Sequence, residues 1–280
     1  MAVPIDDRFP LSRLDDEFVE YYYDKLASLG TNLPPWVKDT SGHGNVKDIT
    51  VPSDDGHFIT ISAGPYPVHI NLHGGGFVLG NLRSDAHLCA QFCDVLGIMV
   101  LDVDYRLAPA HTIGRGHDDA WAAVRWVYAH AAEINTLPDS ISLGGISAGG
   151  HISASLVPSL VQNEFAPCLN WERIKWFANQ YTPQTEQAKA KVSNRPAFFK
   201  RPIEGNLAGL SDTFLATADC DPCRDEGEAL GMALLAHGVK VTMRRYMGVP
   251  HPFMHMQPIR KAQLYVRDVC EALRSAHARI

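Results

Sequence analysis

The sequence lacks the features that mark membrane-spanning, secreted and nucleic-acid-binding proteins. It has no run of about 18 apolar residues, so no transmembrane helix is expected. Its net charge of −6 offers no basic excess, so no nucleic-acid partner is expected either. The first residues, Met1–Arg8, lack the apolar segment of a secretory signal peptide. We therefore expect a cytoplasmic protein without stable membrane insertion.

Cysteine is also too sparse for a disulfide framework, with six residues in a chain of 280. Cys220 and Cys223 form a C-x-x-C pair, which in other proteins holds a metal ion or a redox-active disulfide. It has neither a second such pair nor a nearby pair of histidines, so we expect no metal and no cofactor. Cys89 and Cys93 lie four residues apart on an amphipathic stretch and are expected to be small buried apolar residues.

What the sequence does contain is typical of a soluble globular protein. Hydrophobic residues make up 46% of the chain and charged residues 20%, which is enough apolar material for a large core. The length suits a single α/β domain over residues 1–280.

Apolar runs and helical patterns alternate along this chain. Strands are expected within 46–61, as a strand–turn–strand unit, and over 67–72, 98–103, 141–143, 213–218 and 239–246. Helices are expected over 85–96, 118–132, 226–237 and 259–277, with Trp121, Val124, Val127 and Tyr128 of the second helix facing inward. This alternation predicts a mostly parallel, doubly wound sheet with helices on both faces.

Residues Gly145–Gly149 read G-I-S-A-G and fit G-x-S-x-G, the pattern of a nucleophilic serine on a tight turn between a strand and a helix. The residues that flank such a serine must be small, because the turn is strained and closely packed. The turn exposes the Ser147 hydroxyl and directs the Ala148 amide toward a substrate carbonyl. The pattern also fits an ordinary glycine-rich turn, so its meaning depends on its context.

The context favours catalysis. His73–Gly76 read H-G-G-G after an apolar run, and consecutive glycines can turn backbone N–H groups toward an oxyanion. Downstream come Asp221 and then, after the last predicted strand, His251. Serine, acid and histidine in this order follow the chain order of α/β-hydrolase triads.

Four segments together resemble the hormone-sensitive lipase family of α/β-hydrolases. They are H-G-G-G (73–76), D-Y-R-L-A-P (104–109), G-G-I-S-A-G-G (144–150) and D-P-C-R-D-E-G (221–227). The resemblance runs from about Val68 to the C-terminus. It implies an α/β-hydrolase fold with a small helical cap, and a cofactor-independent carboxylesterase for short to medium acyl esters.

The motifs also imply roles for individual residues. By position, Ser147 is the expected nucleophile, His251 the base and Asp221 the acid that orients the base. The expected oxyanion hole consists of the N–H groups of Gly75, Gly76 and Ala148. Arg106 is expected to form an ion pair that braces the oxyanion loop, because a buried arginine needs an acidic partner.

The residues alone leave some of these assignments open. Asp219 and Asp225 are alternatives to Asp221, although Asp225 fits better as a residue that caps a helix or braces the loop. His255 is an alternative to His251, but the position directly after the last strand favours His251.

The resemblance implies that residues 1–40 belong to the cap, and residues about 163–200, which hold aromatic residues among several prolines, are a candidate for its second half. Ligand sites are often lined by such residues, but both segments also fit simple core packing. The expected substrate-binding residues are Phe18, Trp36, Phe77 and Ile146.

Two features depart from the family pattern. Ile146 stands where the residue before the nucleophile is usually Asp, which removes a charge and hydrogen bonds beside Ser147. Only Ala148–Ala154 separate the elbow from a predicted strand at Ser155–Pro158, whereas a parallel crossover needs about ten to twelve residues. Either the helix runs on and the next strand is missing, or the crossover is truncated, and both would disturb the packing that holds Ser147. A divergent paralogue and an incorrectly spliced product are the two hypotheses for this departure.

The leading hypothesis is a serine carboxylesterase acting on a small, fairly apolar ester such as a specialised metabolite, with a homodimer left open. Plant gibberellin receptors resemble esterases but lack a working triad, and other plant relatives eliminate water from flavonoids. A catalytically impaired ligand-binding protein and a lyase or dehydratase therefore remain alternatives. The intact Ser147, Asp221 and His251 argue against a receptor, whereas Ile146 and the short crossover argue mildly for one.

Overall fold

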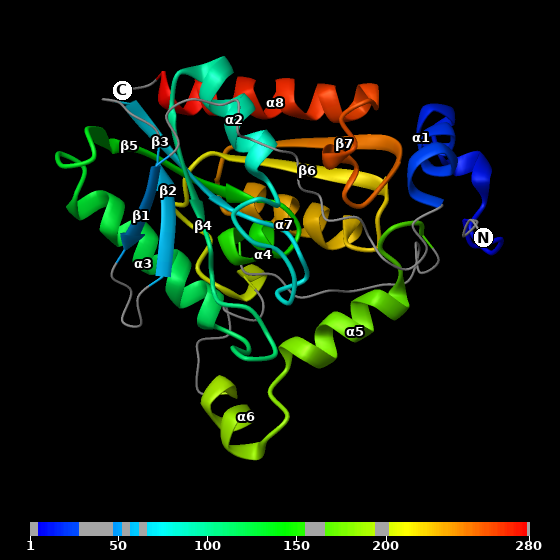
Figure 1. The fold of residues 1–280 in the computed structure, drawn as a ribbon, viewed down its shortest axis with the longest axis horizontal. Helices are drawn as coiled ribbons and strands as arrows, with labels where there is room; N and C mark the ends of the chain where they lie inside the picture. The colour runs from blue at the N-terminus through cyan, green and yellow to red at the C-terminus, as the bar shows by residue number, and fades with distance from the viewer. Residues whose placement is uncertain are drawn as a thin grey trace. The chain divides into compact units, whose positions relative to one another are not determined.

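A computed structural model describes residues 5–27, 47–51, 57–61, 66–154, 166–193 and 202–278. The chain groups into two compact units, each with its own sheet (Figure 1). The five-strand unit comprises Val37–Ser155, Phe177–Phe199 and Cys270–Ile280. The two-strand unit comprises Met1–Trp36, Leu156–Trp176 and Lys200–Val269. The expectation of a single domain with two cap segments stays a prediction.

The sheet of the five-strand unit has the strand order β1-β2-β4-β3-β5. Its strands are β1 (Lys47–Val51), β2 (His57–Ile61), β3 (Tyr66–Leu72), β4 (Met99–Val103) and β5 (Thr136–Gly145). β3 is parallel to both β4 and β5, whereas β2 is antiparallel to β1 and β4. The expected strand–turn–strand unit at the antiparallel edge and the parallel strands beside it are thus confirmed.

Helices pack against both faces of this sheet. Successive side chains of β3 point to opposite faces, so each face can be identified from the residues of β3 that a helix contacts. One face belongs to the unit's core, which joins β3, β4 and α3 (Arg115–Ala129) through Val68, Ile70, Leu72, Leu101, Ala120, Ala123 and Val127. On the other face, the His69 ring packs edge-on against Phe92 of α2 (Ala86–Leu96) at 6.0 Å. The doubly wound arrangement is confirmed for this unit.

The inward face of α3 was predicted wrongly in part. Trp121 and Tyr128 are 62% and 64% exposed, and the helix contacts the sheet through Ala120, Ala123 and Val127. Small side chains let the helix approach the sheet closely, so the large aromatic residues beside them are left at the margin. The prediction for Val127 was correct, since it is fully buried.

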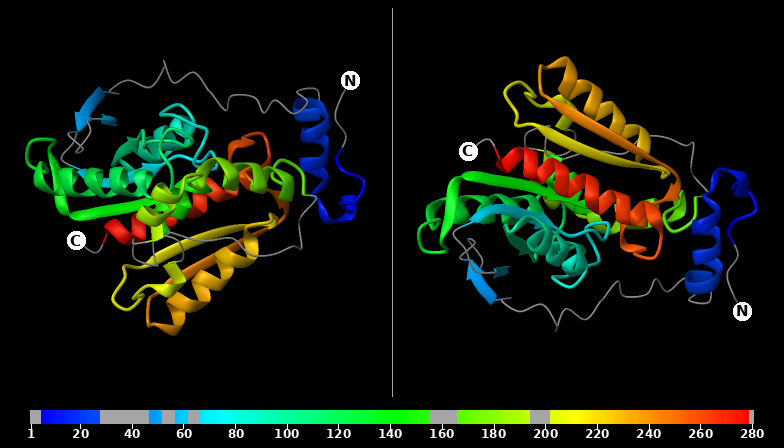
Figure 2. Two further views of the ribbon diagram at one scale, coloured as in Figure 1. Left: turned by 90° about the horizontal axis from the view of Figure 1, so that it is seen from below. Right: turned by 90° about the horizontal axis from the view of Figure 1, so that it is seen from above.

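The two-strand unit is built on a parallel pair, β6 (Thr213–Cys220) and β7 (Val241–Pro250), joined by α7 (Arg224–Ala236). Figure 2 shows α7 running beside both strands. The helix α8 (Arg260–His277) begins in this unit and ends in the five-strand unit. These elements confirm the predicted strands and helices of this part, with β7 extending to Pro250.

The N-terminal segment of this unit contacts both sides of the turn that follows β7. The segment contains three short helices, namely η1 (Leu11–Arg13), α1 (Asp16–Tyr21) and the π-helix η2 (Tyr22–Leu26). The Asp15 N–H donates to the Gly248 carbonyl at 2.7 Å, and the Asp15 carboxylate pairs with Lys261. The Glu17 carboxylate accepts the N–H of Arg260, the first residue of α8, at 3.0 Å.

Three further α-helices and two short 3-10 helices remain. The α-helices are α4 (Ala148–Ala154), α5 (Trp171–Tyr181), which begins in the two-strand unit and ends in the five-strand unit, and α6 (Glu186–Ser193). Two short 3-10 helices, η5 (Pro202–Glu204) and η6 (Phe253–His255), lie in the two-strand unit. The predicted strand at Ser155–Pro158 lies outside the described residues, so the short crossover stays a prediction.

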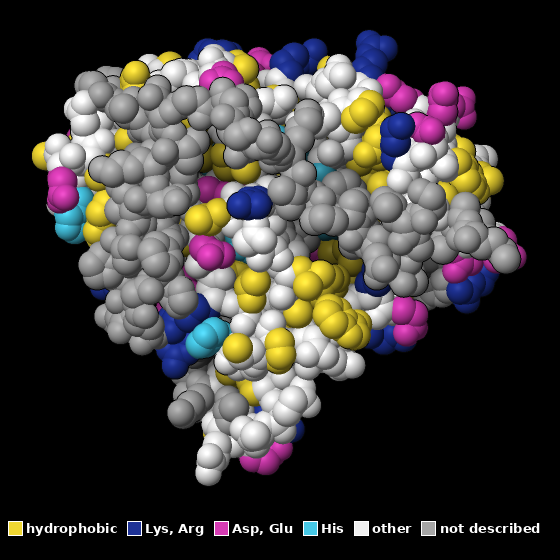
Figure 3. Space-filling model, viewed as in Figure 1, with side chains coloured by type: hydrophobic (Ala, Val, Ile, Leu, Met, Phe, Trp, Pro, Cys, Tyr) yellow, Lys and Arg dark blue, Asp and Glu magenta, His cyan; other side chains and the backbone are white. Residues whose placement is uncertain are grey.

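Charged side chains of both signs are interspersed over the face drawn in Figure 3. Within the described ranges, no helix is long and apolar enough to cross a membrane.

Candidate active site

Ser147 occupies a strained turn between β5, which ends at Gly145, and α4, which begins at Ala148. Its φ of 55° lies in the left-handed region that non-glycine residues rarely adopt. A Cβ on Gly149 would overlap the carbonyl oxygen of Leu72, so only glycine fits there. The strand–turn–helix setting that gives G-x-S-x-G its catalytic meaning is therefore present.

The glycine loop His73–Gly76 lies directly beside this turn, because β3 and β5 are parallel neighbours with Leu72 opposite Gly145. A Cβ built on Gly74 would lie 3.6 Å from the Ser147 Cβ. Gly75 and Gly76 have φ values of 130° and 61°, which favour glycine. The structure thus brings the predicted oxyanion residues and the predicted nucleophile together within the five-strand unit.

Two contacts hold the start of the glycine loop. The Tyr105 hydroxyl donates to the His73 carbonyl at 2.7 Å, and the two rings stack with centroids 4.3 Å apart. His73 Nδ1 lies 2.7 Å from the Gly74 carbonyl oxygen, which can only accept, so Nδ1 carries the proton. Burial lowers the pKa of His73, which favours this neutral form.

The D-Y-R segment braces the loop as expected. Arg106 forms a buried ion pair with Asp119 of α3, with Nη2 and Oδ1 2.7 Å apart, and its own N–H also donates to Asp119. Two residues on, the N–H of Ala108 donates to the carbonyl of Phe77 at 2.8 Å. The ion pair therefore fixes the chain that supports the far end of the glycine loop.

In the two-strand unit, the structure brings His251 and Asp221 together. They follow the ends of β7 and β6, where Pro250 and Cys220 are paired residues of the parallel ladder. His251 Nδ1 lies 2.7 Å from Asp221 Oδ2, and both side chains are largely buried. An ionised carboxylate can only accept, so Nδ1 carries the proton and Nε2 has a free lone pair. This is the tautomer that a general base needs.

The alternative acids have other partners. Asp219 lies 3.3 Å from Arg224 Nη1, and Asp225 lies 2.8 Å from Arg224 Nη2. The N–H of Cys223 donates to Asp221 Oδ1 at 2.8 Å, which fixes the second oxygen of that carboxylate. Asp225 also lies in the first turn of α7, where an acidic residue interacts favourably with the helix dipole.

Ser147 belongs to the five-strand unit, and Asp221 and His251 belong to the two-strand unit. The structure thus describes two half-sites, one with the serine and the glycine loop and one with the histidine and its acid. A hydrogen bond from Ser147 to His251 stays a prediction.

The geometry of the two half-sites agrees with comparisons to known proteins. Residues 69–167 and 158–255 match a family model described as alpha/beta hydrolase fold. The chain belongs to this family. The resemblance to its hormone-sensitive lipase branch is confirmed by relatives that are named as carboxylic ester hydrolases.

Two of these relatives come from Mycobacterium tuberculosis. The carboxylesterase NlhH is 30% identical over 97% of this chain and 94% of its own length. The carboxylic ester hydrolase LipN is 31% identical over 76% of this chain, and the match spans 65% of LipN, just under two thirds of that protein. Among solved structures, the Pyrobaculum calidifontis esterase is 26% identical, with a TM-score of 0.75 over 83% of this chain and 86% of that chain.

Aromatic residues from α5, which lies in the candidate cap segment 163–200, join the glycine loop in the five-strand unit; the sequence indicated an aromatic wall from this segment but not which residues contact the loop. The rings of Phe77 and Tyr181 stack with centroids 4.0 Å apart, and the Phe177 ring lies where a Cβ on Gly76 would be. His151, one turn after Ser147, packs edge-on against Phe77 at 4.9 Å. Burial lowers the pKa of His151 to about 3, so this imidazole is neutral. The contacts were hidden because α5 is distant in sequence from the loop.

The expected substrate-binding residues lie in different surroundings. Ile146 is 6% exposed, and its side chain faces Gly74 in the five-strand unit. Phe18 is fully buried within the two-strand unit, which agrees with a packing role. Trp36 lies outside the described residues. The substrate-binding roles of these residues and of Phe77 stay predictions.

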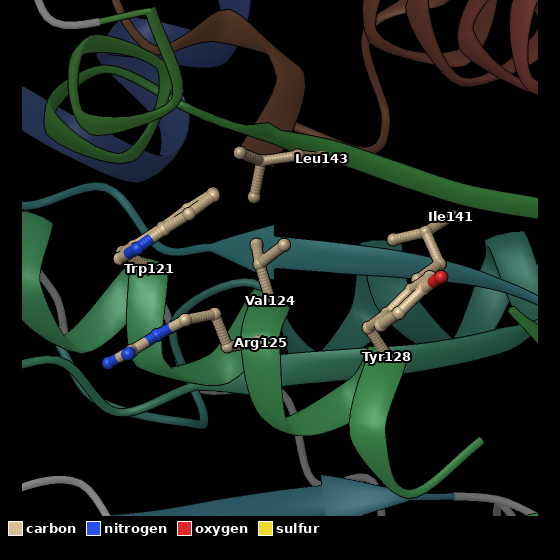
Figure 4. Close-up of a pocket in the computed structure, with 6 residues that line it drawn as sticks. All are labelled: Trp121, Val124, Arg125, Tyr128, Ile141 and Leu143. Atoms are coloured by element: carbon tan, nitrogen blue, oxygen red, sulfur yellow. The ribbon is translucent and has the colours of Figure 1, made fainter.

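An apolar hollow of about 450 Å³ lies between α3 and β5 of the five-strand unit. Figure 4 shows Trp121 and Tyr128 of the helix and Leu143 of the strand at its wall, and none of these is a predicted site residue. The thiols of Cys220 and Cys223 are free. Among the residues that the structure describes, no group of three or more His, Cys, Asp or Glu side chains is placed to hold a metal ion.

Proposed function

We propose that this protein is a serine carboxylesterase that hydrolyses short to medium acyl esters of a small, fairly apolar substrate. The observation that carries the proposal is the His251–Asp221 pair, which holds the imidazole in the tautomer of a general base. The strained Ser147 turn beside the glycine loop supplies the matching nucleophile and oxyanion donors. The named activities of the relatives support the same reaction class.

In the proposed reaction, His251 Nε2 takes the Ser147 hydroxyl proton while the serine oxygen attacks the ester carbonyl. The N–H groups of Gly75, Gly76 and Ala148 bind the resulting oxyanion. The imidazolium, stabilised by Asp221, then gives its proton to the leaving alcohol, and an acyl-enzyme remains. Water attacks the acyl-enzyme by the same route, which releases the acid and restores the serine.

In this proposal, the aromatic residues near the glycine loop determine which sizes of ester substrate are accepted. The stacked rings of Phe77 and Tyr181 would pack against an apolar acyl or alcohol group. Ile146 adds an apolar side chain beside the serine where a carboxylate is usual, which suits an uncharged ester. An apolar environment of this kind gives no preference for an ionic substrate.

The test is hydrolysis of p-nitrophenyl acetate, butyrate and octanoate by purified protein. Ser147→Ala is expected to lower kcat/KM at least about a thousandfold, because the nucleophile is lost. Ser211→Ala is the matched control, since Ser211 is exposed. Labelling by a fluorophosphonate should likewise require Ser147.

The other outcomes separate the alternatives. Folded protein that neither turns over esters nor accepts the label would overturn the esterase proposal and favour a ligand-binding protein. Labelling without ester turnover, together with elimination of water from a flavonoid, would favour the lyase or dehydratase. Light scattering of the same sample would show whether the protein forms a homodimer, which the sequence left open.

A further inference from the structure

The side chain of His151 lies close to the turn that carries the predicted nucleophile. The N–H of His151 donates to the Ser147 carbonyl at 2.8 Å, so the two residues are one helical turn apart, about 5.4 Å along the axis of α4. Side chains on a helix lean toward its N-terminus and cover the preceding turn. The imidazole of His151 therefore lies over the turn that begins at Ser147.

Ring contacts place the same imidazole beside the end of the glycine loop. It packs edge-on against Phe77 with ring centroids 4.9 Å apart, and Phe77 directly follows Gly76, a predicted oxyanion donor. His117, in the first turn of α3, packs edge-on against it at 5.7 Å. Phe77 also has a φ of 63°, a strained backbone conformation of the kind found at functional sites. His151 is thus held between α3, α4 and the glycine loop, all within the five-strand unit.

The two ring nitrogens of His151 have no hydrogen-bond partner within the part of the chain that the structure describes, and neither nitrogen is exposed to solvent. A buried polar atom without a partner lowers stability, so such atoms are rare in folded proteins. Phenylalanine would fill the same space without that cost. Packing alone therefore does not account for a histidine at this position.

The protonation state of His151 limits what it can bind. Burial, followed by the charge of His117, lowers the pKa of His151 to about 3. The ring is therefore neutral and offers one N–H donor and one acceptor lone pair. A hydroxyl group matches this pair, because it also donates and accepts. A carboxylate does not, because a buried anion needs a positive charge that a neutral ring lacks.

The ring can present a nitrogen to a bound group without repacking. His151 is partly exposed although both of its nitrogens are covered. A half-turn about the Cβ–Cγ bond exchanges each ring nitrogen with a carbon and leaves the outline of the ring unchanged. A hydroxyl group beside the ring would favour the orientation that brings a nitrogen to it.

We propose that His151 is a specificity-determining residue that hydrogen-bonds a hydroxyl group of the substrate, so that the preferred substrate is a small hydroxy ester rather than a plain alkyl ester. The hydroxyl belongs on the second carbon from the ester group, because that carbon and a hydrogen bond of about 2.8 Å together span roughly one helical turn. The inference rests on the proposed function, because the ester carbonyl must be held at Ser147 for the hydroxyl to reach His151.

The first test compares esters that differ only by a hydroxyl in place of a methyl group. On the acyl side the pair is p-nitrophenyl 3-hydroxybutyrate and p-nitrophenyl 3-methylbutyrate. On the alcohol side the pair is 2-hydroxyethyl butyrate and propyl butyrate. The purified protein should have a kcat/KM at least about tenfold higher for the hydroxy ester of one pair, and that pair identifies the side of the substrate that faces His151. Lack of this preference in both pairs would overturn the inference.

The second test removes both nitrogens but keeps an aromatic ring against Phe77. His151→Phe should lower the preference for the hydroxy ester about tenfold and change kcat/KM for the methyl counterpart little. His111→Phe makes the same substitution at an exposed position of the same unit and should keep the preference. Comparison between variants cancels the intrinsic reactivities of the esters. An equal loss for both esters of a pair in His151→Phe would show a packing role only and contradict the proposal.

A measurement without turnover separates this inference from the proposed function. Ser147→Ala protein, labelled with ¹⁵N in its histidine rings, is titrated with each ester and followed by NMR. The His151 signals, identified by their absence after the additional change His151→Phe, should move further with the hydroxy ester of one pair than with its methyl counterpart. Equal movements would overturn the inference even if esters are hydrolysed. Selective movement without serine-dependent hydrolysis by the unsubstituted protein would overturn only the proposed function.

Discussion

The carbonyl oxygen of Leu72 occupies the space that a Cβ on Gly149 would need. The end of β3 therefore presses directly on the first turn of α4, immediately after Ser147. This close approach links the strand that leads into the glycine loop to the turn that carries the nucleophile. Any side chain at Gly149 must push these two segments apart.

Gly149→Ala is expected to abolish ester hydrolysis and to lower the melting temperature, because the overlap is with backbone that cannot rotate away. Gly97→Ala is the control: Gly97 has a positive φ, which Gly149 does not, but there is open space around its Cβ position. That control should cost about 1 kcal/mol of stability and leave kcat/KM unchanged. Thermal unfolding followed by circular dichroism, alongside hydrolysis rates, measures both effects. Full activity of Gly149→Ala would contradict the described turn.

Asp221→Asn is expected to lower kcat by about four orders of magnitude without unfolding the protein. An amide can donate its own proton to His251 Nδ1, which places the imidazole proton on the wrong nitrogen. Asp225→Asn serves as the matched control, because Asp225 pairs with Arg224 rather than with the histidine. Steady-state kinetics of both variants decide the assignment. A large loss in Asp225→Asn with activity kept in Asp221→Asn would reverse it.

Tyr181→Ala is expected to raise KM several-fold for octanoate esters and to change KM little for acetate esters. The substitution removes the ring that stacks on Phe77, and with it apolar area that a longer acyl chain would contact. Tyr128→Ala removes a tyrosine that is 64% exposed and is the control. The acyl-length profile of each variant tests this role, and equal changes for all esters would argue against it.

Glu226→Gln is expected to become more stable relative to the unsubstituted protein as pH rises. Burial, followed by the charges of Asp221 and Asp225, raises the pKa of Glu226 from 4.5 to about 8. The folded state therefore binds this proton more tightly than the unfolded chain. The stability that the proton provides is present below about pH 4.5 and is lost as pH rises through about 8. The gap in melting temperature should widen between pH 5 and 8.5.

Glu271→Gln, at an exposed position of α8, is the control for this titration. Its melting temperature should follow that of the unsubstituted protein at every pH. A constant gap between Glu226→Gln and the unsubstituted protein would show that Glu226 does not titrate in this range.

The sequence was sufficient to predict the features that depend on residues close together in the chain. The glycines around Ser147 predict the tight turn, and apolar runs that end just before Asp221 and His251 predict their position at the ends of parallel strands. Side chains at neighbouring strand ends meet whatever the surrounding loops do. The order of strands and helices along the chain was therefore enough to predict most of the fold and the residues of both half-sites.

Packing between distant segments was not predictable in the same way. The large side chains Trp121 and Tyr128 suggested a buried face, but small alanines of α3 contact the sheet instead. Asp85 was read only as the start of a helix, although its carboxyl lies inside the protein. In both cases the sequence pattern predicts the helix correctly, but segments that are distant in the sequence and pack against it determine which side chains are buried.

The contacts of Asp15 and Glu17 with Gly248, Lys261 and the start of α8 give the N-terminal segment an influence on the histidine half-site. Gly248 precedes His251 by three residues, and Arg260 begins α8, so the segment between them is tethered at each end to residues more than 200 positions earlier in the chain. Loss of those early residues would free the turn that orients the imidazole. Proteolysis within this N-terminal segment would then lower the rate of ester hydrolysis by loosening the histidine.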